Sequence, residues 1–190
     1  MSDAEADDKV VILDRDGTIV IDRGYLGDPE GLQFEPQAAE ALQWLHAHGY
    51  RLVVITNQSG VGRGYFTLDR LEAMNTRLAA MVQESGARLA GIYYCPHAPE
   101  EGCACRKPAQ GLLERAASEL GFDPAAAVVI GDTASDIEFG RRAGAMTILI
   151  AAEAPPASSG AHADYIAPNL MAAARIVTSE RRARGAEPRC

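Results

Sequence analysis

Short, continuous apolar runs alternate with amphipathic stretches along most of the chain. The apolar runs lie at residues 10–13, 51–55, 89–94, 127–130 and 147–150, and their lengths predict strands that are buried on both faces. Apolar residues at helical spacing predict helices at 37–48, 68–85, 112–120, 136–143 and 170–177, and a weaker run at 164–166 predicts a short edge strand. Strands that alternate with helices predict an α/β fold with a single parallel, doubly wound sheet of the Rossmann-like type.

The remaining segments indicate one domain. We expect an acidic, disordered leader at residues 1–8, a single domain at 9–178 and a flexible basic tail at 179–190. No internal repeat or linker divides the middle of the chain. The intervals between the first and second strands, and between the second and third, are too short for an inserted domain, so we expect no large cap domain over the sheet.

The composition of the 190 residues is ordinary for a globular protein, with 47% hydrophobic and 23% charged residues. The formal net charge of -8 argues against binding to nucleic acid or to an anionic membrane. No apolar run approaches the roughly 20 residues that a membrane span needs. The acidic start, MSDAEADDK, is unlike a signal peptide, so we expect a cytoplasmic protein, and by default a monomer.

Polar clusters follow the predicted strands at their carboxyl ends. The set is Asp14 and Asp16 after the first strand, Thr56 and Asn57 after the second, Asp132 after the fourth, and Arg106 and Lys107 after a long loop. Because the carboxyl ends of parallel strands share one edge of a sheet, we expect these side chains to converge.

This set suits metal-assisted phosphoryl transfer. Magnesium prefers oxygen ligands, which Asp14 and Asp132 can supply. A carboxylate nucleophile would give an aspartyl-phosphate, while Asp16 could protonate the leaving oxygen and then activate water. Thr56 and Lys107 could hold the phosphate oxygens. A single strand followed by Asp and Gly is often only a turn, but three such clusters at strand ends favour a catalytic site.

A second chemical cluster lies in the loop after the third strand. Cys95, His97, Cys103 and Cys105 offer three sulfur atoms and one nitrogen, which is a usual tetrahedral zinc set. With four protein ligands no position remains for water, so the zinc would be structural and would order the loop that leads to Lys107. A disulfide between Cys103 and Cys105 is less favoured, because the ring would be short and strained.

The strand-end motifs resemble those of a known family. DRDGT at 14–18, TNQSG at 56–60, RKP at 106–108 and GD at 131–132 resemble the four ordered motifs of the haloacid dehalogenase superfamily of phosphatases. Within it the chain resembles the branch of heptose 1,7-bisphosphate 7-phosphatases and histidinol-phosphate phosphatases, which share the Cys-x-His and Cys-x-Cys pairs. The resemblance covers about residues 9–151, and it implies a Mg²⁺-dependent phosphatase with a structural Zn²⁺.

Particular roles come with the resemblance. It implies that Asp14 is the nucleophile and Asp16 the general acid and base. Magnesium would be held by Asp14, the backbone carbonyl of Asp16, and Asp132. The other implied roles are phosphate binding by Thr56 and Lys107, and orientation of Lys107 by Asp136.

Specificity without a cap must come from loops that face a phosphorylated sugar. The candidate substrate-binding residues are Asp22, Arg23, Gly24, Tyr25, Asn57, Gln58, Ser59, Arg63 and Arg106. Arg63 and Arg106 offer guanidinium forks for a second phosphate. The loops at 24–26 and 59–64 look more like those of the heptose bisphosphate phosphatases, which implies removal of the 7-phosphate of the sugar. A histidinol-phosphate phosphatase, or a phosphatase of a related sugar bisphosphate, is the alternative.

Two observations bear on that resemblance. Receiver domains also carry Asp, Thr and Lys at strand ends, but they lack a second carboxyl two residues after the first-strand Asp, and they lack the cysteine loop. The chain also departs from the family pattern, because Gln37 stands where Gly often follows Pro36, and Thr133 stands where Lys or Ser often follows the aspartate.

Overall fold

Six parallel strands form one sheet in the order β3-β2-β1-β4-β5-β6. The computed structural model describes residues 9–153 and 162–185, so the expected leader at 1–8 and the end of the expected tail at 186–190 lie outside the described residues. The strands are β1 (Val10–Leu13), β2 (Arg51–Asn57), β3 (Leu89–Cys95), β4 (Val128–Gly131), β5 (Met146–Ile150) and β6 (Tyr165–Ala167). The helices are α1 (Ala38–Ala47), α2 (Leu68–Glu84), α3 (Gly111–Leu120), α4 (Ala134–Arg142) and α5 (Leu170–Gly185).

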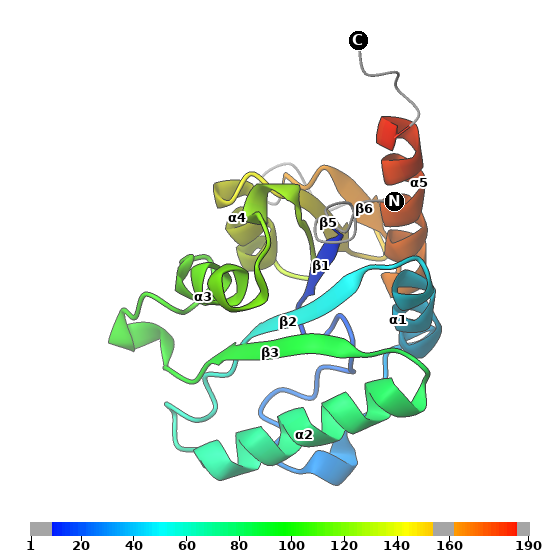
Figure 1. The fold of residues 1–190 in the computed structure, drawn as a ribbon. Coiled ribbons are helices and arrows are strands. Elements are labelled where there is room, and N and C mark those ends of the chain that lie inside the picture. Colours follow the sequence, from blue (N-terminus) through cyan, green and yellow to red (C-terminus); the bar gives the residue numbers. More distant parts are fainter. Residues whose placement is uncertain (1–8, 154–161, 186–190) are drawn as a thin grey trace.

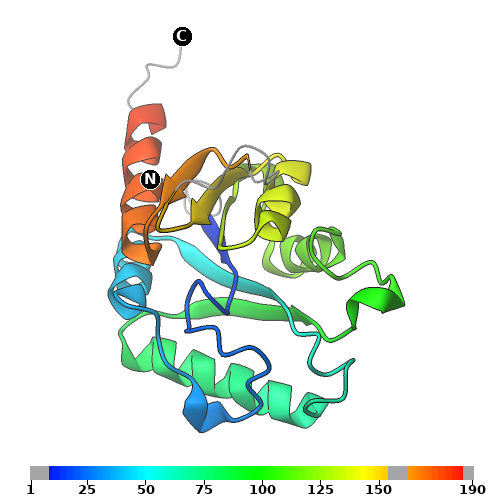
Figure 2. The ribbon, with the colours of Figure 1, turned by 180° about the vertical axis from the view of Figure 1, so that it is seen from behind.

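Helices cover both faces of the sheet, as the continuous apolar strands require. In β1 the side chains of Val11 and Leu13 pack with α1, α2 and α5 in one core cluster. Val10 and Ile12 point the other way and pack with α3 and α4 in a second cluster. Figures 1 and 2 show α1 and α5 side by side, with α3 and α4 on the far side of the strands. The predicted α/β fold class is therefore confirmed.

The observed elements differ from the sequence prediction mainly at their ends. Strand β2 continues to Asn57, past the expected end at Ile55. Helix α5 continues to Gly185, past the expected end at residue 177 and into the segment expected to be a flexible tail. Among the described residues, no helix has the length and apolar character that a membrane crossing requires.

Gln37 occupies a position whose backbone explains the family preference for glycine. It precedes α1 with φ at 64°, in the left-handed region that costs an ordinary residue roughly 1–2 kcal/mol. Its side-chain Oε1 accepts a hydrogen bond from Asn169 Nδ2 at 3.3 Å. The glutamine at this position therefore affects the start of α1 and lies away from the strand-end motifs.

The strand order places β1 between β2 and β4. From β1 the chain first adds β2 and β3 on one side, and then adds β4, β5 and β6 on the other side. A crevice at the carboxyl ends of such strands is where open α/β sheets bind ligands. The segments at 14–37 and 58–67, which are described throughout, hold one short 3₁₀ turn, η2 (Pro29–Gly31), and no inserted domain. The crevice is thus bordered by loops, as predicted.

Candidate active site

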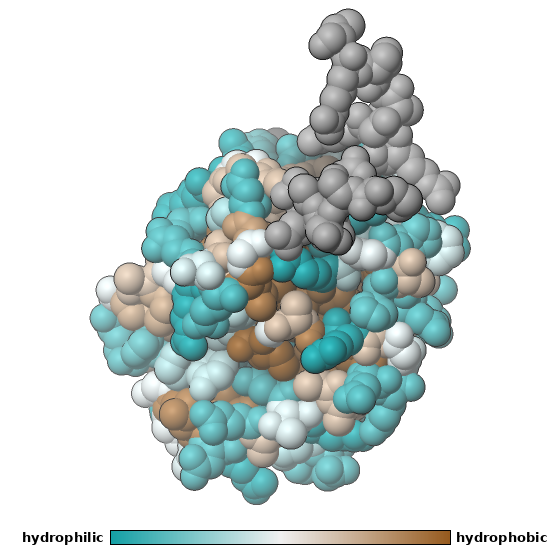
Figure 3. Space-filling view, in the orientation of Figure 1, coloured by the Kyte–Doolittle hydropathy of each residue, from teal (hydrophilic) through white to brown (hydrophobic). Residues whose placement is uncertain are grey.

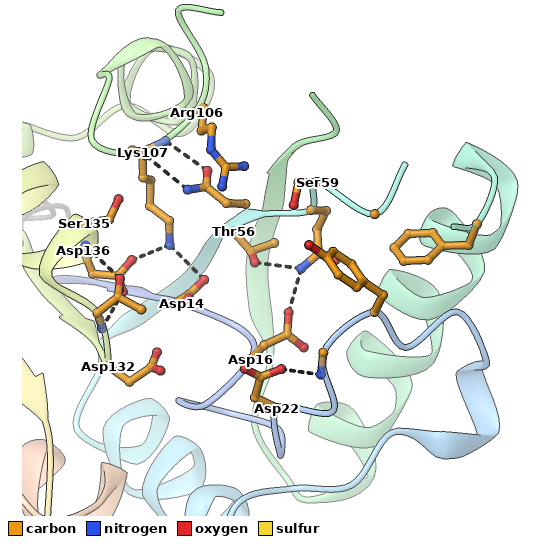
Figure 4. Close-up of a pocket in the computed structure, with 17 residues that line it drawn as sticks. Asp14, Asp16, Asp22, Thr56, Ser59, Arg106, Lys107, Asp132, Ser135 and Asp136 are labelled. Atoms are coloured by element: carbon orange, nitrogen blue, oxygen red, sulfur yellow. Dashed lines mark hydrogen bonds and ion pairs between the residues drawn. The ribbon is translucent and has the colours of Figure 1, made fainter. Parts of the chain in front are cut away.

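The site is built around a buried lysine at the sheet edge. The ammonium Nζ of Lys107 lies 2.8 Å from Asp14 Oδ1 and 2.6 Å from Asp136 Oδ1 (Figure 4). It also donates to the carbonyl oxygen of Ile55 at 2.7 Å. Burial alone would lower the pKa of Lys107, but the charges of Asp14 and Asp136 outweigh it and raise that pKa. Lys107 therefore stays protonated and pairs with two carboxylates, one in the loop after β1 and one in α4.

Three carboxylates lie close together at this edge of the sheet. Oxygen atoms of Asp14, Asp132 and Asp136 lie within 4.8 Å of one another. Burial raises the pKa of Asp14 despite the lowering effect of Lys107. Burial, with the charges of Asp14 and Asp136, raises the pKa of Asp132 to about 7. The excess of negative charge and the oxygen-only donor set are features that a divalent metal ion requires.

Asp136 is held in place by the start of α4. Thr133 precedes the helix, and its Oγ1 donates to Asp136 Oδ2 at 2.6 Å and accepts from the Asp136 backbone N at 3.3 Å. One carboxylate oxygen of Asp136 thus belongs to a capping box while the other contacts Lys107. Thr133, which the sequence analysis singled out as a departure, therefore orients the residue that was expected to orient Lys107.

Asp16 lies on the other side of the pocket, next to β2. Gln58 Nε2 donates to Asp16 Oδ2 at 2.7 Å and to Thr56 Oγ1 at 3.0 Å (Figure 4). The guanidinium of Arg15 also contacts the Asp16 carboxylate, with Nη2 3.0 Å from Oδ2. No role for Arg15 follows from the sequence, because loops lack the periodic pattern from which the direction of a side chain can be predicted.

Asn57 connects the end of β2 to the backbone beside the lysine. Its Oδ1 accepts from the Lys107 backbone N at 3.0 Å, and its Nδ2 donates to the Lys107 carbonyl at 3.2 Å. The amide of Asn57 therefore pairs with both backbone groups of Lys107, as the backbone of a neighbouring strand would. It fixes the backbone from which the Lys107 side chain reaches Asp14.

The four expected zinc ligands come together in the loop before Lys107. The sulfur atoms of Cys95, Cys103 and Cys105 are 3.2–3.4 Å apart, and His97 Nδ1 lies 3.2 Å from Cys105 Sγ and 3.6 Å from Cys95 Sγ. The three thiols are free, since a disulfide requires sulfur atoms about 2.05 Å apart. Three sulfur atoms and one ring nitrogen at nearly equal spacing fit a tetrahedral metal ion.

A pocket of about 610 Å³ opens over this edge of the sheet. Of the expected substrate-binding residues, those that line it are Asp22, Gly24, Tyr25, Asn57, Gln58, Ser59 and Arg106. Arg23 is outside this lining and donates to Gln33 Oε1 at 2.7 Å. Arg63 is also outside it and forms an ion pair with Glu100 at 3.2 Å.

The pocket also contains residues that the sequence analysis missed. Ser135 lines it, and its buried hydroxyl has no hydrogen-bond partner among the described residues. Phe66 lines it too, and its ring packs against Gly60, where any Cβ would clash. A polar residue in the first turn of a helix, directly after a strand-end motif, is the signal that could have identified Ser135.

Comparisons with known proteins agree with this geometry. A HAD-hydrolase-like family model matches residues 104–173. D-glycero-β-D-manno-heptose-1,7-bisphosphate 7-phosphatase of Pasteurella multocida is 37% identical over 177 residues, which are 89% of this chain and 96% of the relative. The enzyme of the same name from Helicobacter pylori is 43% identical over 148 residues, 77% of this chain and 85% of the relative.

A solved structure matches the chain over nearly its full length. The D,D-heptose 1,7-bisphosphate phosphatase of B. bronchiseptica, complexed with magnesium and phosphate, superposes with a TM-score of 0.80 and 29% identity over 90% of this chain and 99% of that one. Together with the strand-end site, this places the molecule in the class of HAD-like phosphatases, which hydrolyse phosphate esters. Within that class, the chain belongs to the family of D-glycero-D-manno-heptose-1,7-bisphosphate 7-phosphatases.

Gly17 provides a test of this geometry. Its φ is 74°, and a Cβ there would clash with the carboxylate of Asp132. We expect Gly17→Ala to lower phosphatase activity roughly 100-fold, because it displaces a carboxylate at the sheet edge, and to lower the free energy of unfolding by about 1–2 kcal/mol. Phosphate release and chemical denaturation measure the two effects.

Gly49→Ala is the matched control. Gly49 also has a positive φ, 81°, but no atom lies within 4 Å of its ideal Cβ position, and it follows α1 away from the site. We expect the same loss of stability without loss of activity. Equal activities of the two variants would contradict the proposed contact with Asp132.

Proposed function

We propose that this protein removes the 7-phosphate of D-glycero-D-manno-heptose 1,7-bisphosphate by way of an aspartyl-phosphate. The observation that carries the proposal is the near-full-length similarity to relatives named for this substrate, in a chain whose Asp14 and Lys107 meet at the sheet edge. The pocket volume, about 610 Å³, is in the range of small-ligand sites. A small phosphorylated sugar is compatible with this volume.

The first half-reaction is assigned to Asp14 and Asp16. A carboxylate oxygen of Asp14 attacks phosphorus, and the bond between phosphorus and the sugar oxygen breaks. Asp16 gives its proton to that oxygen, so the sugar leaves as an alcohol. In the second half-reaction Asp16 takes a proton from water, the water oxygen attacks phosphorus, and inorganic phosphate leaves Asp14.

Thr56 and Lys107 are assigned to the phosphate oxygens. Thr56 Oγ1 accepts from Gln58 Nε2, which leaves the hydroxyl proton of Thr56 free to donate to the substrate. The ammonium of Lys107, beside Asp14, offsets the charge of the incoming phosphate. Asp136 keeps that ammonium in position through its 2.6 Å ion pair.

We propose that Mg²⁺ binds at Asp14, the backbone carbonyl of Asp16, and Asp132. The donor set fits this ion, and a related solved structure is described as a complex with magnesium and phosphate. When bound, Mg²⁺ neutralises the phosphate so that the anionic Asp14 can approach it.

We propose Zn²⁺ for the cluster of Cys95, His97, Cys103 and Cys105, as a structural ion. The ion would order the loop that ends in Arg106 and Lys107. Metal-binding thiols need a reducing compartment, which supports a cytoplasmic location. The expected monomeric state stays a prediction.

The substrate assignment is tested by comparing esters with the wild-type protein and Mg²⁺. We expect the β-anomer of D-glycero-D-manno-heptose 1,7-bisphosphate to be hydrolysed with a kcat/KM at least about 100-fold above that of histidinol phosphate, because the two ligands fill the pocket differently. Phosphate release gives the rate, and phosphorus NMR identifies the product as the 1-phosphate. A preference for histidinol phosphate, or release of the 1-phosphate, would contradict the assignment.

The nucleophile is tested by Asp14→Asn. We expect activity to fall roughly 10³-fold or more, since the amide is not nucleophilic. The fold should be retained, because Lys107 keeps its 2.6 Å ion pair with Asp136. Phosphate release and thermal denaturation measure the two effects. Asp123→Asn, at a 3₁₀ turn before β4, is the control that should keep full activity. A rate of Asp14→Asn close to that of the wild type would refute the assignment.

The metal loop is tested by Cys103→Ser. We expect zinc to fall from about one ion per chain to below about half, because one of four ligands is weakened, and activity to fall roughly 10-fold through disorder next to Lys107. Mass spectrometry of the metal content and phosphate release are the measurements. Cys190→Ser, which changes the one cysteine of the sequence that is not a proposed ligand, should retain zinc and activity. Full zinc occupancy in Cys103→Ser would exclude Cys103 as a ligand.

A further inference from the structure

A buried arginine lies beside the active site without a part in the proposed reaction. Arg15 is only 2% exposed and is among the largest fully buried side chains of the described residues. It does not line the pocket, although Asp14 and Asp16 on either side of it do. A charged side chain is rarely so buried unless it is paired, so its contacts indicate what it does.

The guanidinium of Arg15 donates hydrogen bonds to both carboxylate oxygens of Asp16. Arg15 Nε donates to Asp16 Oδ2 at 3.1 Å, and Nη2 donates to Oδ1 at 3.2 Å. Nη1 lies 3.5 Å from the side-chain oxygen of Asn75, a buried residue of α2. The fork of the arginine is thus anchored on a helix at one end and fixes the plane of a carboxylate at the other.

Gln58 completes the arrangement. Its Oε1 accepts from Arg15 Nη2 at 2.8 Å, while its Nε2 donates to Asp16 Oδ2 at 2.7 Å and to Thr56 Oγ1 at 3.0 Å. The reverse orientation of the amide would point its N–H groups at the guanidinium and its oxygen at the carboxylate. The amide therefore has one favourable orientation, in which it holds Asp16 from a second direction.

We propose that Arg15 and Gln58 are positioning residues that aim the Asp16 carboxylate at the oxygen of the leaving group. The inference rests on the proposed role of Asp16 and deepens it. Proton transfer requires heavy atoms about 2.6–3.2 Å apart, so a carboxylate that rotates freely would be an inefficient acid. The contacts hold one side of Asp16, while its side chain stays 23% exposed and lines the pocket.

The test varies the leaving group while the shape of the substrate stays nearly constant. A series from phenyl phosphate to 4-nitrophenyl phosphate spans poor to good leaving groups, and only the poor ones need a proton from Asp16. Values of kcat/KM across this series are measured with Mg²⁺ for wild type, Arg15→Lys, Gln58→Met and Asp16→Asn. Lysine keeps the charge of Arg15 but lacks the planar fork, and methionine keeps the length of Gln58 but removes its amide.

We expect Arg15→Lys and Gln58→Met to lower kcat/KM for phenyl phosphate about 10–100-fold, and for 4-nitrophenyl phosphate only about 2–3-fold. Both variants would thus show the steep leaving-group dependence of Asp16→Asn. If the two residues had only a structural role, kcat/KM would fall by the same factor for every ester, and its dependence on the leaving group would equal that of the wild type. This result would overturn the proposal. Unchanged rates in both variants would overturn it as well.

Two controls separate this inference from its alternatives. Arg51→Lys changes an arginine at the opposite end of β2, where Nη1 donates to the Leu120 carbonyl at 2.6 Å, and it should leave rates and slope unchanged. If Arg15→Lys fails to fold, Gln58→Met decides by the same criterion. Because the series contains no sugar, a wrong sugar assignment leaves the test valid, whereas no hydrolysis of any ester by wild type would contradict the proposed reaction itself.

Discussion

The ammonium of Lys107 is the contact on which the rest of the site depends. It is nearly inaccessible, and it reaches Asp14 after β1, Asp136 in α4 and the Ile55 carbonyl of β2 at 2.6–2.8 Å. Without it, carboxylates from neighbouring strands would face one another in a buried crevice with no charge to offset them. Burial, together with the charges of Asp14 and Asp136, raises the pKa of Asp132 to about 7. A crevice of this kind is prepared for a further cation.

The position of Lys107 is determined by long-range contacts and not by a strand of its own. Asn57 holds its backbone through two hydrogen bonds, and Asn57 itself pairs with Cys95 at the end of β3. The loop from Cys95 to Cys105 has little regular structure, but its four metal-binding side chains converge. A metal ion there would tie both ends of that loop together, and the lysine follows directly. The cysteine cluster and the polar edge of the sheet are thus two parts of one arrangement.

The sequence was sufficient to predict the fold and to predict which polar residues follow most of the strands. Five apolar runs, with Asp14, Thr56 and Asp132 directly after three of them, predict a parallel sheet with a polar edge, because continuous apolar strands must be covered on both faces. The sequence did not reveal the pairing of Arg63 with Glu100, or that of Arg23 with Gln33. Whether an arginine faces a ligand or a nearby carboxylate depends on how loops fold against each other, and loops have no hydrophobic period to reveal it.

Arg15, within the DRDGT motif, is a further arginine whose partners could not be predicted from the sequence. The two aspartates of DRDGT were identified by their chemistry, while no role was assigned to the arginine between them. In the structure Arg15 is buried because Asp16, Gln58 and Asn75 provide acceptors from three separate segments. Its ion-pair partner, Asp16, is also the residue that we propose gives and takes the proton, so the group that balances the buried guanidinium is one that the reaction would use. The two acidic residues therefore differ in their surroundings, since Lys107 contacts Asp14 and the Arg15–Gln58 pair contacts Asp16.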